Sequence, residues 1–257
     1  MSCIFCNSTE NLDTIEHIVP ESLGNGNYIL PKESICKDCN NKFSKFEKEA
    51  ISSSIIGFEK TRFAIRSKKG KIPSSKVQDI EFGGDEQGRK DIVLLKGIKT
   101  EDIKSYDPKT GIMEIVVPGF DKNSVQISKF LLKIGFESLY KSERQRFEIY
   151  DFSELLHYLN NRNNNDWPFL VIQNEKAPFI SIPRFYDKFQ LNKINCKLLY
   201  LEMNMNTFLF RFEYGGFKAN INLLNRNVEW IKEYIASEKD KDYIHPDHFR
   251  NDIVISS

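Results

Sequence analysis

Residues 14–25 of the chain read TIEHIVPESLGN, and they lie between two cysteine pairs that share the spacing Cys-x-x-Cys. The four cysteines are Cys3, Cys6, Cys36 and Cys39. Two such pairs can bring four thiolates to one zinc ion, and four protein ligands leave no open position for a substrate. The sequence therefore predicts a structural Zn²⁺ that holds together a segment too short to have its own core. The alternatives are two disulfides, which a reducing compartment disfavours, or four buried thiols.

The segment framed by these cysteines predicts a strand, a turn, a second strand and a helix. Residues 14–19 carry the β-branched side chains typical of a strand, which Pro20 ends. Glycines and asparagines over residues 24–27 indicate a turn, and residues 28–35 are expected to return as an irregular strand. From Asp38 onward, apolar side chains recur at helical spacing.

Taken together, these residues resemble the HNH endonuclease family. The shared pattern is Cys-x-x-Cys, then Glu-His-Ile-x-Pro-Glu-Ser-Leu-Gly, then Cys-x-x-Cys-Asn-x-x-Phe, and it spans residues 3–43. The resemblance is closest to the branch with a four-cysteine zinc. It implies a zinc-stabilised ββα-metal finger at the N-terminus and the hydrolysis of phosphodiester bonds in DNA.

The resemblance also implies roles for three residues. His17 matches the general base that takes a proton from the attacking water, and an ordinary histidine titrates at about 6.5, which suits a base at neutral pH. Glu16 matches the acidic ligand of a catalytic divalent ion, and Asn40 matches the ligand on the helix. Carboxylate and amide oxygens suit Mg²⁺ or Mn²⁺. Outside the cysteine frame, a packed histidine beside a solvated acid would be the simpler interpretation.

The chain departs from the family pattern in the turn and in the second strand. Asn25 follows Gly24 where relatives usually have two glycines, and asparagine tolerates the positive φ of such a turn. Many relatives also carry an asparagine in the second strand that pins the loop. Here Pro31 and Lys32 lie near that place, and Asn25 or Asn27 are the candidates to replace it. The middle residue of the His-Asn-His trio is left unassigned.

The composition describes a globular protein without a strong overall charge. Of 257 residues, 40% are hydrophobic and 28% are charged, and the formal net charge is +1, so any nucleic-acid contact must come from local charge. No apolar run approaches the roughly 18 residues of a membrane helix. The N-terminal MSCIFC lacks the basic start and apolar stretch of a secretory signal. We therefore expect a cytoplasmic protein with no membrane partner.

One local segment is basic enough to contact nucleic acid. Residues 60–71, KTRFAIRSKKGK, hold no acid, and a stretch of this kind can neutralise several phosphates. Gly70 and Pro73 indicate an arm, and the alternative is a solubilising linker. The residues expected to bind nucleic acid are Arg62, Arg66, Lys68, Lys69 and Lys71. The sequence thus divides into an HNH domain over residues 1–57, a basic linker or arm over 58–74, and a third part over 75–257.

The third part predicts a larger mixed α+β domain that recognises the substrate or a partner. Helical periodicity is strongest over residues 124–143 and recurs over 152–162 and 227–239. Strand-like runs with aromatic side chains fill much of the remainder, including 196–203 and a hairpin that bends at Gly215–Gly216. Three further residues are expected to have no catalytic or metal-binding role. Cys196 is expected in the core, and His245 and His248 are expected in an exposed tail.

Two functions from different classes compete. The first is a metal-dependent HNH endonuclease that cuts or nicks DNA, with RNA as a subsidiary substrate. The resemblance links it to bacterial restriction or antiphage defence, and a protein activator or a homo-oligomer is compatible with it. The second is a non-catalytic zinc-finger module that binds nucleic acid or protein. The trio Glu16, His17 and Asn40 favours the nuclease, because a binding module does not need all three at these spacings.

Overall fold

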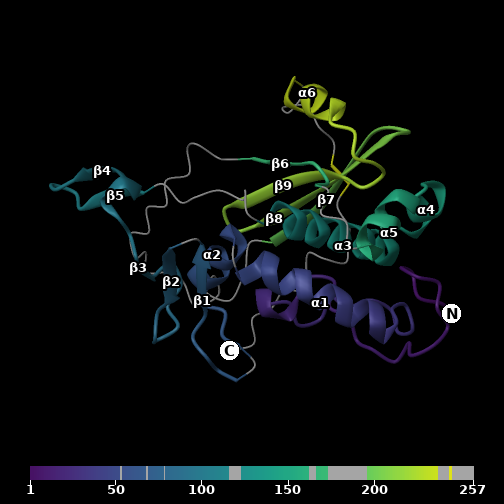
Figure 1. Cartoon of the computed structure of the whole chain (residues 1–257), viewed down its shortest axis with the longest axis horizontal. Helices are drawn as coiled ribbons and strands as arrows, with labels where there is room; N and C mark the ends of the chain where they lie inside the picture. The colour runs from purple at the N-terminus through teal and green to yellow at the C-terminus, as the bar shows by residue number, and fades with distance from the viewer. Residues whose placement is uncertain are drawn as a thin grey trace.

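The computed structural model of the chain combines helices with antiparallel sheets, as expected for an α+β protein (Figure 1). It describes residues 1–52, 54–67, 69–77, 79–115, 123–161, 166–172, 196–236 and 243–244. The predicted tail histidines His245 and His248 lie outside these ranges.

The two strands expected before the first helix are reduced to one β-bridge. His17 pairs with Ile29, and two backbone hydrogen bonds flank the pair, Ile18 N to Tyr28 O at 3.1 Å and Leu30 N to Glu16 O at 2.9 Å. Pro20 follows and opens a short 3-10 helix, η1 (Glu21–Leu23). The loop then returns to α1 (Lys37–Ser52), which confirms the helix predicted from Asp38.

The structure differs from the flexible arm expected over residues 58–74. A second helix, α2 (Ile55–Arg62), covers the start of that range, and the Ser54 side chain caps it by accepting a hydrogen bond from Ile56 N. Burial of the apolar and polar side chains of α2 explains why it is ordered, since Ile56, Glu59 and Thr61 are all shielded from solvent. Close packing against α1 requires Gly57, where a Cβ atom would collide with the Ile51 carbonyl oxygen.

A small sheet and a hairpin follow α2. β1 (Ser74–Val77), β2 (Ile80–Gly84) and β3 (Val93–Lys96) form an antiparallel sheet with a small apolar cluster of its own. After η2 (Thr100–Asp102), β4 (Ile103–Asp107) pairs with β5 (Ile112–Ile115), and this hairpin projects away from the body at the left of Figure 1. The strands β1 and β2 were not anticipated from the sequence.

The largest sheet packs against the longest helix. Its strand order is β6 (Phe169–Val171), β9 (Phe217–Asn222), β8 (Thr207–Tyr214), β7 (Cys196–Asn204), and all neighbours are antiparallel. The buried helix α3 (Ser124–Ser142) lies on this sheet, where Gly135 allows close contact with Phe210. The remaining helices are α4 (Arg144–Ile149), α5 (Ser153–Asn160) and α6 (Glu229–Ala236). The helices α3, α5 and α6 and the β8–β9 hairpin match the predicted segments, whereas α4 was not expected.

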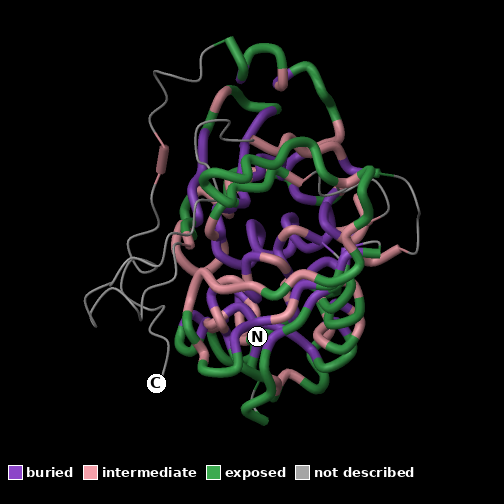
Figure 2. The backbone as a smooth tube through the Cα atoms, turned by 90° about the vertical axis from the view of Figure 1, so that its left-hand side faces the viewer, coloured by how far each residue is buried: buried purple, intermediate pink, exposed green. Residues whose placement is uncertain are grey.

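One hydrophobic core joins the N-terminal finger to α3 and the large sheet. The same buried cluster contains Cys3 and Phe43 of the finger together with Phe130 and Phe212. Polar contacts cross the same junction: the Tyr214 hydroxyl donates to Leu23 O at 3.1 Å. Figure 2 shows the buried stretches gathered in the middle of the molecule with exposed loops around them. The contacts that hold the finger therefore come partly from residues far along the chain.

Candidate functional site

The four paired cysteines converge on one point. Their sulfur atoms all lie within 4.8 Å of one another, and Cys6 Sγ lies 3.6 Å from Cys36 Sγ. A tetrahedral zinc site with Zn–S bonds of about 2.3 Å requires sulfur atoms about 3.8 Å apart, so the separations suit the ion. No disulfide joins these cysteines. The cluster could therefore hold a zinc ion, as the spacing predicted.

Backbone contacts bring the two cysteine pairs together. Cys3 N donates to Ser8 O at 2.8 Å, which closes the first knuckle, and Ile4 N donates to Ser34 O at 2.9 Å, which ties it to the second. Cys39 lies in the first turn of α1. Within the cluster, a hydrogen bond from Cys39 lowers the pKa of the Cys3 thiol to about 4, whereas the pKa of Cys39 is raised. The cluster thus favours a thiolate, the form that binds metal.

His17 occupies a partly exposed position beside the 3-10 helix. Its Nε2 atom lies 3.8 Å from Glu21 Oε2, and its side chain is 25% exposed. Its Nδ1 atom is buried and has no hydrogen-bond partner among the residues that the structure describes. The β-bridge to Ile29 fixes the backbone at this point. A histidine held in this way offers its Nε2 atom, on the side of Glu21, for proton transfer.

Glu16 is buried and forms an ion pair with α3. Only 6% of the residue is exposed, and its Oε1 atom lies 2.5 Å from Lys133 Nζ. The same ammonium group lies 2.7 Å from Glu47 Oε1 and 3.0 Å from Glu137 Oε2. Lys133 therefore pairs with three carboxyl groups. We call these four residues, Glu16, Glu47, Lys133 and Glu137, the Lys133 cluster.

Burial and charge set the protonation of the Lys133 cluster. Burial raises the pKa of Glu16, and the charge of Lys133 opposes this effect only in part. Burial likewise raises the pKa of Glu137 well above its usual value. Burial lowers the pKa of Lys133, but the surrounding carboxylates outweigh it and hold that pKa well above the usual value. The surrounding carboxylates thus favour the charged form of the lysine, and burial favours the neutral forms of Glu16 and Glu137.

Asn40 lies close to the backbone just before Glu16. Its Nδ2 atom lies 3.5 Å from Ile15 O, one residue before Glu16, while a Glu16 oxygen is engaged by Lys133. Among the described residues, the cysteine cluster is the one group of three or more histidine, cysteine or acidic side chains that could hold a metal ion. The Glu16 carboxylate, which was expected to hold Mg²⁺ or Mn²⁺, is engaged by Lys133 as it is arranged here.

Asn25 pins the loop between the β-bridge partners. It is 1% exposed, and its Nδ2 atom donates to Val19 O at 2.5 Å and to Tyr28 O at 2.9 Å. Its Oδ1 atom accepts from Tyr28 N at 2.9 Å and from Asn27 N at 3.2 Å. Of the two asparagines that the sequence left as candidates, Asn25 thus holds the loop, and the exposed Asn27 side chain does not.

The predicted basic residues differ widely in their surroundings. Arg62 is engaged inside the protein, where its guanidinium group binds Glu59 Oε2 at 2.6 Å and also pairs with Asp91. Arg66 is exposed and donates to Gly70 O at 3.1 Å and to Glu86 O at 2.6 Å. Lys69 and Lys71 are exposed, and Lys68 lies outside the described residues. Arg62 is therefore a structural residue rather than an open phosphate contact.

Lys133 and Glu137 are site residues that the sequence did not single out. Both were hidden in the apolar stripe of the helix predicted at residues 124–143. The available signal was a lysine between Leu132 and Ile134, with a glutamate four residues later, in a helix whose neighbouring positions are mostly apolar. Lysine and glutamate are almost never fully buried unless they are paired, so this pattern indicates an internal ion pair.

Comparison with known proteins identifies the N-terminal segment. Residues 3–55 match the family model described as HNH endonuclease, which confirms the resemblance inferred from the motif. The match includes the cysteine cluster, Glu16, His17 and Asn40, and it ends at the first residue of α2. Neither a curated protein nor a solved structure matches the chain. Among the described residues, no helix is long and apolar enough to cross a membrane.

Proposed function

We propose that this protein is an HNH endonuclease that hydrolyses phosphodiester bonds in DNA. The observation that carries the proposal is the family match over residues 3–55, because it covers a segment that contains the cysteine cluster and in which His17 lies at a partly exposed position. We assign the cysteine cluster to a structural Zn²⁺. The match implies a nucleic-acid substrate, and DNA is the substrate that we propose.

His17 is the proposed general base. Hydrolysis of a phosphodiester requires a group that takes a proton from the attacking water as the new phosphorus–oxygen bond forms. His17 can accept this proton at its exposed ring edge, and Glu21, with Oε2 at 3.8 Å, stabilises the resulting positive charge. The pinning of the loop by Asn25 keeps the imidazole in place relative to the finger.

The catalytic divalent ion remains a separate part of the proposal. The resemblance assigns Mg²⁺ or Mn²⁺ to Glu16 and Asn40, but Glu16 is committed to Lys133 in this structure. Binding of the ion by that pair would require the Glu16 carboxylate to leave the Lys133 cluster. We therefore derive no step of the reaction through the ion.

The ion pair between Glu16 and Lys133 supports a second candidate function. If Glu16 stays in its ion pair with Lys133, the finger lacks an acidic metal ligand and acts as a non-catalytic module that binds nucleic acid. In both alternatives, residues beyond 75 would recognise a partner or the substrate. The assignment to restriction or antiphage defence is a proposal that follows from the nuclease alternative.

A cleavage assay with matched histidine variants tests the nuclease proposal. Purified wild type, His17→Ala and His157→Ala are incubated with plasmid DNA in Mg²⁺ or Mn²⁺, with a chelator as the negative control. His157 is an exposed residue of α5 and serves as the matched control. Loss of a general base typically lowers the rate by about 10²–10⁴-fold, so His17→Ala should lose cleavage and His157→Ala should keep it.

The assay also separates the two candidate functions. Zinc content and thermal stability should be equal in the wild type and both variants, because the zinc ligands are unchanged. Undiminished cutting by His17→Ala would overturn the proposed role of His17. A wild type that binds DNA but does not cut it with either ion would favour the non-catalytic module.

A further inference from the structure

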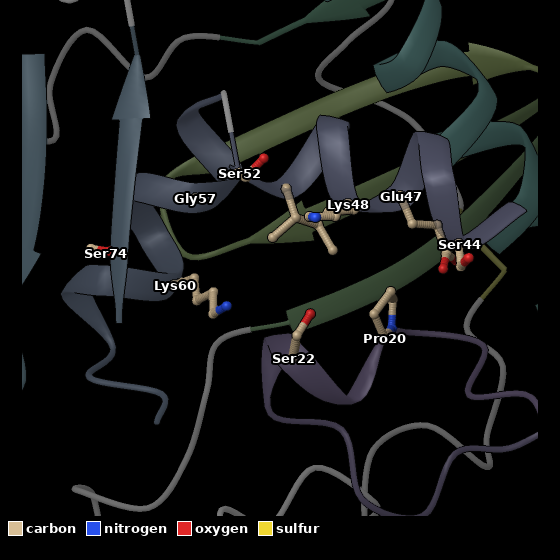
Figure 3. A pocket seen from close by; sticks show the side chains of 10 residues that line it. Pro20, Ser22, Ser44, Glu47, Lys48, Ser52, Gly57, Lys60 and Ser74 are labelled. Carbon is tan, nitrogen blue, oxygen red and sulfur yellow. The ribbon is translucent and has the colours of Figure 1, made fainter. Parts of the chain in front are cut away.

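An open groove runs from the finger toward α2 and β1 (Figure 3). Its volume is about 370 Å³, and its walls come from η1, α1, α2 and β1, so only part of it belongs to the segment that matches the HNH family. Hydroxyl and ammonium groups dominate the polar part of the lining, which includes Ser22, Ser44, Lys48, Ser52, Lys60 and Ser74.

Lys60 is the residue that most clearly indicates what kind of ligand this groove binds. The residue is half-buried on α2, and burial lowers the pKa of its ammonium group. The Lys60 side chain has no ion pair or hydrogen bond within the described part of the chain, in contrast to that of Arg62, which pairs with Glu59 and Asp91. A half-buried charge without a counterion is unfavourable unless a ligand supplies the opposite charge. The groove is therefore suited to an anion.

A second cation and a hydroxyl group face the same space. Lys48 lies on α1 across the groove from Lys60, and it too has no ion-pair or hydrogen-bond partner among the described residues. Figure 3 shows the nitrogen atoms of Lys48 and Lys60 and the hydroxyl group of Ser22 directed into the gap between the elements. Two ammonium groups with a nearby hydroxyl donor provide the charge and the hydrogen bonds that a phosphate oxygen accepts.

The one acid of the lining does not cancel this charge. Glu47 reaches the groove from α1, but its carboxylate is paired with Lys133 at 2.7 Å and is only 15% exposed. Its carboxylate is therefore engaged by a cation of the protein interior. Lys48 and Lys60 retain their charge for a ligand.

The groove and the candidate catalytic residue both contact the short helix η1. Pro20 and Ser22 line it, and Glu21, which lies between them in sequence, contacts His17 at 3.8 Å. A polymer bound across His17 would place a neighbouring unit of its backbone in the groove. A nucleic-acid strand carries a phosphate at every such unit, whereas a small anion would have no reason to extend from one place to the other.

From these contacts we propose that the groove binds a backbone phosphate of the DNA substrate, with Lys48 and Lys60 as its cationic contacts. The proposal rests on the proposed nuclease function and adds the position of a substrate phosphate next to the cleavage site. Contacts of this kind hold the strand in place and carry no sequence information. The same variants should therefore weaken binding similarly for unrelated DNA sequences.

The test measures binding of a short fluorescent duplex in the presence of a chelator, so that cleavage plays no part. The variants are Lys60→Gln, Lys48→Gln and the double variant, and the control is Lys232→Gln, which removes an exposed lysine of α6. Each lost phosphate contact lowers the slope of log K against log salt by about 0.9 for duplex DNA. The double variant should lower the slope by about this amount, each single variant by part of it, and the control should not change it.

A second measurement guards against misfolding of the variants. Amine acylation of the wild type followed by mass spectrometry should show that duplex DNA protects Lys60 and Lys48 but not Lys232. An unchanged salt slope in the double variant, unprotected lysines, or no binding of the duplex by the wild type would each overturn the inference. If the wild type cuts DNA while the slope is unchanged, only the groove proposal fails. If the slope falls while His17→Ala cuts normally, the groove stands and the proposed nuclease mechanism fails.

Discussion

Lys133 Nζ lies 2.5 Å from Glu16 Oε1, so a residue of α3 neutralises the acid that directly precedes His17. The two residues are 117 positions apart in sequence, and Lys133 is completely buried. The candidate site is therefore coupled to the part of the chain beyond the HNH segment. A finger cut free at residue 57 would leave Glu16 without this counterion.

Lys133→Met should destabilise the protein strongly. The substitution keeps the apolar stem but leaves Glu16, Glu47 and Glu137 buried without a cation, and breaking a buried ion pair in this way costs about 3–5 kcal/mol. Chemical denaturation measures the change in the free energy of unfolding. Lys129→Met is the matched control, because Lys129 lies one turn earlier on α3 and donates to the Asn161 carbonyl oxygen. The control should lose much less stability.

The loss in Lys133→Met should also depend on pH. The pKa of Glu137 is raised in the folded state above its usual 4.5, so the folded state binds more protons, and this contribution to stability falls as the pH rises above that value. Removal of Lys133 raises the folded-state pKa of the acids further. The variant should therefore be relatively more stable at about pH 5 than at about pH 8. An equal loss at both pH values would contradict the role of the carboxylates.

Asn25→Ala should impair both the loop and catalysis. The substitution leaves Val19 O and Tyr28 N without their Asn25 partner in a buried place, and such a loss costs about 1–3 kcal/mol. His17 lies in the same loop, so cleavage should fall while the zinc content stays at one ion per chain. Thermal denaturation and plasmid cleavage measure the two effects. Asn27→Ala, which removes an exposed side chain, is the control and should change neither.

Gly57→Ala should destabilise the junction of α1, α2 and β1. An added Cβ would collide with the Ile51 carbonyl oxygen and would lie 2.8 Å from Ser75 Cβ. Overpacking of this kind typically costs about 1–3 kcal/mol, which outweighs the gain of about 1 kcal/mol in helix propensity. Gly83→Ala is the control, because its nearest neighbour is Leu94 Cβ at 3.7 Å. A melting temperature that is equal in both variants would show that α2 does not pack against α1 in this way.

Removal of zinc should unfold more than the finger. Three of the four cysteines belong to the same buried cluster as the residues of α3 and the large sheet, so the loss of the ion should lower the stability of the whole core in one transition. Metal analysis should find one zinc ion per chain, and calorimetry should show a single transition at a lower temperature in Cys36→Ser. Cys196→Ser is the control and should retain zinc. Zinc-free wild-type protein, purified under reducing conditions, would contradict the assignment.

The sequence by itself determined the features that depend on local spacing. Two Cys-x-x-Cys pairs were enough to predict a four-cysteine cluster, since the geometry of a metal site restricts the spacing of its ligands. The helices α1 and α3 followed from apolar side chains at helical intervals. The weak strands were predicted less well, because the segments around His17 and Ile29 form only one bridge.

Only the tertiary structure decided the partners of the charged residues. Lys133 and Glu16 are 117 positions apart, Arg62 pairs with Asp91 across α2 and the loop before β3, and Lys60, close to Arg62 in sequence, has no such partner among the described residues. The physical reason is that distant side chains pack against a charged group when the protein folds. Those side chains determine whether the group is paired within the protein or available to a ligand. Residue spacing restricts what neighbours along the chain can do, but burial and ion pairing depend on contacts that form only when the whole core has assembled.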